Sequence, residues 1–156
     1  MRTCTFLEQS RICRYGILFI ARVILHHYTY KYGISIPYRT KVGSGFCIGH
    51  FGGIVVSERA VIGKNCNISQ GVTLGKANRG KNEGYPIIGD NVYIGPGAKI
   101  VGKIRVGNNV AIGANCVVTK DAPDNAVVAG VPGEVISYNG SQGYVNKTDY
   151  SELGTI

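Results

Sequence analysis

Few side chains in this sequence can do chemistry, and one histidine stands apart from the others. The 156-residue chain contains three histidines, of which His26 and His27 are adjacent in an apolar N-terminal stretch. His50 instead follows Gly49 in a glycine-rich segment. An imidazole titrates close to neutral pH and can take a proton from a hydroxyl group. His50 is therefore suited to general-base chemistry.

The charge balance indicates the kind of partner to expect. The chain carries a net charge of +8, from 17 Lys and Arg against 9 Asp and Glu. Such an excess favours an anionic partner: a polyphosphate cofactor, a nucleic acid or an anionic membrane surface. The basic residues are spread along the chain without the interleaved aromatic residues that bind single strands, so we expect no nucleic-acid partner.

A six-residue repeat dominates the middle of the chain. From residue 88 onward every sixth residue is branched and apolar, and the fifth position of each hexad is small or apolar. The first positions are Ile88, Ile94, Ile100, Val106, Ile112 and Val118, and the rhythm continues upstream through Val56, Ile62, Ile68 and Leu74. Residues six apart would scatter over all faces of an α-helix. The pattern predicts instead stacked coils of short strands, with Gly or Asn at tight corners.

Two departures from this period bear on function. The spacing between Leu74 and Ile88 is fourteen residues rather than twelve, so residues 76–86 are predicted to leave the coil as a polar, basic loop. A register shift of two residues also precedes Val56.

The cysteines are predicted to be structural. Cys66 and Cys116 fall at inward positions of the repeat, where a small apolar residue is required, and Cys47 is assigned the same role. The five cysteines form no C-x-x-C pair, and the sequence shows no cleavable leader. We therefore expect free thiols in a reducing bacterial cytoplasm.

The segments on either side of the repeat differ from it in composition. Residues 1–32 are predicted to contain a helical segment whose apolar run is interrupted by Arg22 and is too short to span a bilayer. We expect this helix to pack on the protein or on a neighbouring subunit, and the alternative is a basic helix lying on a membrane surface. Residues 33–136 form the predicted coil, and residues 137–156 form a polar tail expected to be mobile or loosely docked.

The hexads, followed by residues 124–133 (DNAVVAGVPG), resemble the hexapeptide-repeat acyltransferases, which fold as a left-handed parallel β-helix. Residues 48–62 (IGHFGGIVVSERAVI) and 67–75 (NISQGVTLG) are similar to the active-site coil of serine acetyltransferases. In pattern they are closest to the related enzymes of capsule and exopolysaccharide clusters, such as the colanic acid acetyltransferases. The resemblance runs from about residue 32 to residue 136. It implies an all-β fold, an acetyl-CoA-dependent O-acetyltransferase, and a homotrimer with active sites between subunits.

The resemblance also implies roles for individual residues. His50 takes the position of the general base, worth roughly 10²–10⁴ in rate. The residues expected to contact acetyl-CoA are Gly75, Lys76, Pro96 and Ala114. The last two are eighteen residues apart, which is one coil, so we expect them on one edge. Lys99 or Lys120 could meet its phosphates. Three residues are expected at the acceptor: Gly49, Glu83 and Tyr85.

The predicted acceptor follows from departures within this resemblance. Serine enzymes have Asp where this chain has Gly49, an acid at the position of Ser35, and an Arg-His pair at Gly84-Tyr85. Losing these charges together removes the means of selecting a zwitterion, and Tyr85 offers a flat surface suited to a sugar. We therefore expect a saccharide acceptor, with serine O-acetylation in cysteine biosynthesis as the alternative. Candidates to orient His50 are Glu58, a backbone carbonyl or a residue of the neighbouring subunit.

Two rival classes remain to be weighed. A zinc enzyme on the same scaffold, such as a γ-type carbonic anhydrase, needs three histidine ligands. Only His50 lies in the coil, so no metal is expected. A non-catalytic β-solenoid that serves as a binding module is the second alternative, and binding of acetyl-CoA would discriminate against it.

Overall fold

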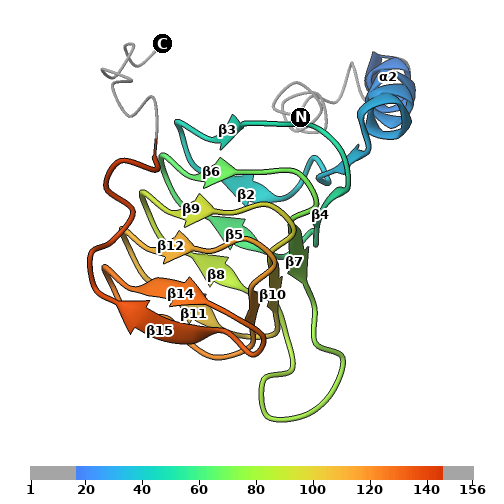
Figure 1. The fold of residues 1–156 in the computed structure, drawn as a ribbon. Helices are drawn as coiled ribbons and strands as arrows, with labels where there is room; N and C mark the ends of the chain where they lie inside the picture. The colour runs from blue at the N-terminus through green and yellow to red at the C-terminus, as the bar shows by residue number, and fades with distance from the viewer. Residues whose placement is uncertain (1–16, 146–156) are drawn as a thin grey trace.

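The computed structural model describes residues 17–145, which form a three-sided, left-handed parallel β-helix preceded by one α-helix (Figure 1). Helix α2 spans Ile17–Tyr32. The strands are β1 (Ile34–Ser35), β2 (Lys41–Val42), β3 (Cys47–Ile48), β4 (Ile54–Val56), β5 (Val61–Ile62), β6 (Asn67–Ile68), β7 (Thr73–Gly75), β8 (Ile87–Ile88), β9 (Tyr93–Ile94), β10 (Lys99–Val101), β11 (Arg105–Val106), β12 (Ala111–Ile112), β13 (Val117–Val118), β14 (Val127–Ala129) and β15 (Glu134–Ser137). The predicted all-β fold is confirmed.

Consecutive strands lie in different sheets, so three strands make one coil. Sheet A has the order β1-β4-β7-β10-β13, sheet B the order β11-β8-β5-β2, and sheet C the order β15-β14-β12-β9-β6-β3. All pairs are parallel except β14 with β15. Coil 1 therefore runs from β1 to β3, coil 2 from β4 to β6, coil 3 from β7 to β9 and coil 4 from β10 to β12. Coil 5 begins at β13 and ends at β14.

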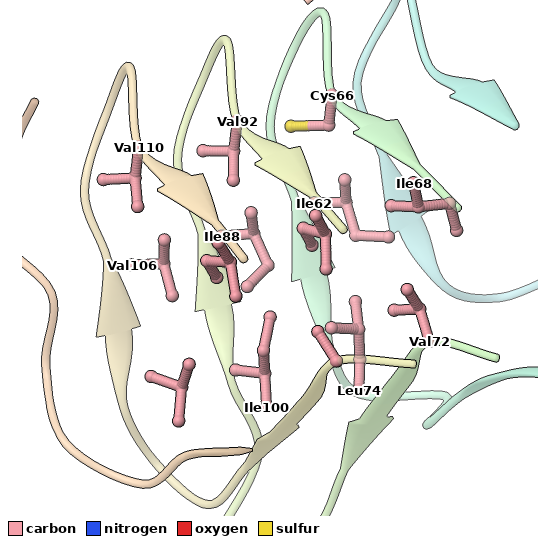
Figure 2. Close-up of a cluster of buried hydrophobic side chains, with 14 of the residues drawn as sticks. Ile62, Cys66, Ile68, Val72, Leu74, Ile88, Val92, Ile100, Val106 and Val110 are labelled. Carbon is pink, nitrogen blue, oxygen red and sulfur yellow. The ribbon is translucent and has the colours of Figure 1, made fainter. Parts of the chain in front are cut away.

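The core is a stack of ladders inside the coils (Figure 2). In sheet B, Ile62 pairs with Ile88, which pairs with Val106, and in sheet A, Leu74 pairs with Ile100. The first and fifth positions of the hexads from residue 56 onward are at most 3% exposed. Burying a branched side chain of this size contributes about 1.5–3 kcal/mol each. The inward direction predicted from the period of six is confirmed.

One corner is built from asparagines, and we call it the asparagine edge: Asn65, Asn91, Asn109 and Asn125. All four have a positive φ, between 53° and 61°, which asparagine tolerates better than most residues. Each side-chain amide donates to the Oδ1 of the next, at 3.1–3.2 Å. The corner therefore stacks through side chains as well as through the backbone.

Helix α2 packs through a narrow face. Leu18 is buried, and Ala21, Leu25 and Tyr38 pack against it. Arg22 Nη2 donates to the Tyr38 hydroxyl at 2.6 Å. Five aliphatic or phenyl side chains of the helix are more than half exposed: Ile17, Phe19, Ile20, Val23 and Ile24. No helix among residues 17–145 has the length and apolar character needed to cross a membrane. The first sixteen residues of the predicted helical segment lie outside the described residues.

The start of the tail, which was expected to be mobile or loosely docked, is hydrogen-bonded to the coils. Strand β15 turns back antiparallel on β14, and the chain then crosses the asparagine edge. Gly140 N donates to Asn125 O and Ser141 N donates to Asn109 O, both at 2.9 Å. Ser141 is only 4% exposed, and its hydroxyl donates to Asn91 O at 2.6 Å. Residues 146–156 lie outside the described residues.

Candidate active site

His50 lies in a corner between sheets C and A that is wider than the corners stacked below it. Gly49 N donates to Ile68 O at 3.0 Å, and Gly71 N donates to Gly52 O at 2.8 Å. Ser69 makes the equivalent bond to Ile94 O, so Gly49 stacks on Ser69 and Gly52 on Gln70. His50 and Phe51 are therefore two extra residues, which explains the register shift in the sequence. Both side chains are exposed, Phe51 at 71%.

Two of the predicted cofactor residues lie on the same edge as His50. Gly97 N donates to Gln70 O at 2.9 Å, and Asn115 N donates to Pro96 O at 2.8 Å. Pro96 and Ala114 thus follow Gln70 down one corner, which we call the His50 edge (residues 49–53, 69–71, 95–97 and 113–115). Neighbouring strands are about 4.8 Å apart, so Pro96 lies about 10 Å and Ala114 about 14 Å below Gly52. Both residues have short side chains at least partly open to solvent, which leaves room for a thin linear ligand along the backbone.

The basic loop of residues 76–86 is an ordered hairpin. Ala77 and Gly84 exchange backbone hydrogen bonds of 3.0 Å in both directions. Asn82 attaches the loop to the next two coils: its carbonyl accepts from Lys103 N at 2.8 Å, and its Nδ2 donates to Thr119 O at 2.8 Å. The hairpin extends away from the stacked coils between β7 and β8 (Figure 1).

The remaining predicted residues lie with this loop, on the edge between sheets A and B. We call it the loop edge (residues 36–40, 57–60, 76–86, 102–104 and 119–121). Gly75 ends β7, and Lys76 follows it. The Tyr85 ring lies between two cations, with Lys76 Nζ and the Arg59 guanidinium carbon each 5.9 Å from its centre. Glu83 is exposed in the same hairpin.

The predicted site residues therefore fall into two groups within one chain. His50, Gly49, Pro96 and Ala114 lie on the His50 edge, whereas Gly75, Lys76, Glu83 and Tyr85 lie at the loop edge. The strands of sheet A separate the two edges, and a three-residue strand such as β7 spans about 10 Å. Within one chain the members of each group lie on the same edge, but the two groups lie on different edges.

Three residues that the sequence suggested as partners of the cofactor phosphates or of His50 make other contacts in the structure. Lys99 Nζ donates to Gly71 O, and Lys120 pairs with Glu134 at 3.1 Å. Glu58, a candidate to orient His50, lies on the loop edge and pairs with Arg39 at 3.9 Å. Within one chain, Glu58 is therefore not the group that orients the imidazole.

The buried cysteines are unsuited to nucleophilic chemistry. Cys66 and Cys116 are both fully buried in the core. Burial raises the pKa of Cys66 from its ordinary value of 9.0 to about 11, and burial also raises the pKa of Cys116. Because the thiolate is the reactive form, these thiols are inert near neutral pH. Cys47 is half-buried in β3.

Sequence reasoning considered Glu58 but missed the three basic residues that lie around it beside the loop. Arg39, Lys41, Glu58 and Arg59 line a surface cavity of about 450 Å³ on coils 1 and 2. The first of these arginines precedes the second by twenty residues, which is the length of coil 1 with its two-residue insertion. A repeat length of twenty rather than eighteen residues for coil 1 would have placed Arg39 directly above Arg59 on the outside of the corner.

Comparison with known proteins identifies the class. Residues 85–120 match the family described as bacterial transferase hexapeptide (six repeats). The chain belongs to the hexapeptide-repeat acyltransferases.

The named relatives are more specific than the family. The chain is 38% identical over 134 residues to a serine acetyltransferase of Synechococcus elongatus, covering 86% of this chain and 54% of that protein. It is 40% identical over 126 residues to a serine acetyltransferase of Bacillus pumilus, covering 81% of this chain and 58% of that protein. The chain thus spans little more than half the length of the curated relatives it matches.

Solved structures agree with these relatives. A serine acetyltransferase from Brucella abortus in complex with coenzyme A has a TM-score of 0.75 and 34% identity, covering 89% of this chain and 54% of that chain. A serine acetyltransferase from Neisseria gonorrhoeae in complex with serine has a TM-score of 0.69 and 37% identity, covering 78% of this chain and 50% of that chain.

These comparisons overturn the predicted saccharide acceptor. Relatives at 38–41% identity are named serine acetyltransferases, and the closeness to capsule and colanic acid enzymes is not supported. The prediction was wrong because it treated missing charges at three positions as the loss of amino-acid recognition. It did not consider that charged groups at other positions of the coil could take over that task.

Proposed function

We propose that this chain transfers the acetyl group of acetyl-CoA to the side-chain hydroxyl of serine. The observation that carries the proposal is the match to proteins named serine acetyltransferase along more than three quarters of this chain. The structures of such enzymes with coenzyme A and with serine support the two substrates. The alternative of a non-catalytic solenoid has no comparable support.

The proposed mechanism is direct transfer with His50 as general base. A ring nitrogen of His50 removes the proton of the serine hydroxyl as its oxygen bonds to the thioester carbonyl carbon. The carbon–sulfur bond then breaks, and the imidazolium returns the proton to the departing thiolate. Proton and charge balance without a covalent enzyme intermediate. The exposure of His50 in a widened corner supports this role, because the side chain fills no space in the core.

The cofactor would be held by backbone and short side chains rather than by a closed pocket. Pro96 and Ala114 continue the edge below His50, and Gly75 and Lys76 lie on the other edge. Acetyl-CoA would supply the thioester at the level of His50, with its remaining length along the coils below.

We infer that the two groups of residues meet between subunits. The His50 edge of one chain would face the loop edge of the next, and three copies placed this way close a ring. The separation of the two groups within one chain supports this arrangement. Sedimentation equilibrium should give about three times the chain mass of 16.7 kDa. A mass of one or two chains would contradict the trimer.

The activity is tested by product identification. Purified protein is incubated with acetyl-CoA and L-serine, free coenzyme A is quantified with a thiol reagent, and the second product is identified by mass spectrometry. We expect stoichiometric O-acetylserine and coenzyme A, and no release above background without serine. Release that is independent of serine, or greater with an oligosaccharide than with serine, would refute the proposed function.

A further inference from the structure

The charged cavity on the loop edge has the properties of a binding site that the proposed mechanism does not use. It is lined by Arg39, Lys41, Glu58 and Arg59, with Ala60 and Val61 beneath them, and its volume is about 450 Å³. Small-molecule sites occupy roughly 300–1,000 Å³. The lining carries three cationic side chains and one carboxylate, so both signs of charge lie around one cavity.

These charges are available to a ligand at low cost. Arg39 and Glu58 form an ion pair at 3.9 Å, with their side chains 54% and 52% exposed. Exposed ion pairs of this kind contribute little to stability, so a ligand can exchange with the pair easily. The Arg59 guanidinium lies 5.9 Å from the centre of the Tyr85 ring, which holds it near the hairpin and next to the cavity. A guanidinium is suited to binding a carboxylate through two parallel hydrogen bonds.

We propose that this cavity binds the amino-acid part of the acceptor, with Arg59 at the α-carboxylate and Glu58 at the α-ammonium group. The inference rests on the proposed function and names the residues that select its acceptor. A polyanion such as the phosphates of coenzyme A fits less well, because Glu58 would repel it. A neutral sugar has no charged group to pair with Arg59 or Glu58. A zwitterion satisfies both signs together.

The height of the cavity along the β-helix matches that of His50. His50 lies in the corner that joins coil 1 to coil 2, and the cavity residues also belong to coils 1 and 2. In a ring of parallel copies, rotation leaves height unchanged, so the cavity of one chain faces the His50 level of its neighbour. The cofactor residues Pro96 and Ala114 lie two and three coils lower. The acceptor and the body of acetyl-CoA would therefore occupy different heights of one groove.

Titration calorimetry on the full chain tests the assignment with three ligands. These are L-serine, ethanolamine, which lacks the carboxylate, and 3-hydroxypropionate, which lacks the ammonium group. The variants are Arg59→Gln and Glu58→Gln. The control is Arg105→Gln, which makes the same substitution at an exposed position of β11. Circular dichroism checks that each variant is folded.

The expected result is a loss that depends on the ligand group. Arg59→Gln should weaken serine binding roughly 10- to 100-fold, the range for a hydrogen bond to a charged group, and leave ethanolamine binding within about twofold. Glu58→Gln should weaken serine binding and spare 3-hydroxypropionate. Arg105→Gln should change neither. Equal losses for serine and ethanolamine in Arg59→Gln, no loss for serine, or no binding of serine to the wild-type protein would each overturn the assignment.

Steady-state kinetics separates this inference from the proposed function. If the wild-type protein forms O-acetylserine but Arg59→Gln has an unchanged KM for serine, the function stands and the cavity assignment fails. If serine binds with the predicted ligand dependence but no O-acetylserine forms, the cavity assignment stands and the function fails. If both hold, Arg59→Gln raises KM for serine about tenfold or more while KM for acetyl-CoA stays within twofold.

Discussion

Replacing Asn91 with alanine should weaken the asparagine edge by an amount that the structure allows us to work out. Asn91 has a φ of 55°, and alanine pays roughly 1 kcal/mol more in this left-handed region. Its side chain accepts from Asn65 Nδ2 and donates to Asn109 Oδ1, both at 3.1 Å. Each hydrogen bond contributes about 0.5–1.5 kcal/mol. We expect Asn91→Ala to lose about 2–4 kcal/mol in the free energy of unfolding, or roughly 5–15 °C in Tm.

Asn91→Gly separates the two contributions. Glycine loses the same hydrogen bonds but adopts the left-handed conformation without strain, so it should be about 0.5–1 kcal/mol more stable than alanine despite its greater freedom when unfolded. Urea denaturation followed by circular dichroism at one fixed protein concentration measures both variants. Asn78→Ala, at an exposed loop position, is the control and should be near neutral. An alanine variant as stable as the glycine variant, or within 0.5 kcal/mol of wild type (about the effect of an ordinary surface substitution), would refute the reasoning.

Two further variants probe the stacking and the core. A Cβ at Gly63 would lie 2.4 Å from Gly89 O, so Gly63→Ala should lose about 1–3 kcal/mol in urea denaturation. Gly49→Ala, whose nearest contact is 3.9 Å, should be near neutral, and equal effects of the two would contradict the close stacking. The pKa of Cys66 is raised from 9.0 to about 11, so between these pH values unfolding releases a proton from this thiol. The free energy of unfolding should therefore fall by about 2–3 kcal/mol as the pH rises from 9 to 11. Cys66→Ala should lack this component, and parallel stability curves for both proteins from pH 8 to 11 would show that the thiol does not titrate as described.

The repeat could be predicted from the sequence because its signal is local and periodic. A branched residue at every sixth position has only one arrangement in which all members point inward, and the ladder of Ile88, Val106 and their neighbours follows from it. The placement of Pro96 and Ala114 on one edge followed from the same arithmetic, since they are one coil apart. The departures from the period were also visible, and they coincide with the corner of His50 and with the loop.

The rest depends on contacts that a repeat does not encode. The bonds of Asn82 to Lys103 and Thr119 join residues 21 and 37 positions apart, and no motif announces them. The tail was expected to be mobile or loosely docked because its composition is polar, and nothing in that composition indicated that Ser141 would be buried against the asparagine edge. The acceptor was mispredicted because recognition was sought at fixed positions only. The two-residue insertion of coil 1, which places Arg39 and Arg59 around one cavity, was not applied to the charged residues.

The central claim is that His50 transfers the proton in acetyl transfer to serine. The most direct test compares the rate of coenzyme A release with saturating serine for wild type and His50→Gln. A thermal-shift measurement with acetyl-CoA should show that both proteins still bind the cofactor. We predict that kcat falls roughly 10²- to 10⁴-fold in His50→Gln while the shift with acetyl-CoA is retained. A folded His50→Gln protein that turns over serine at close to the wild-type rate would contradict the account.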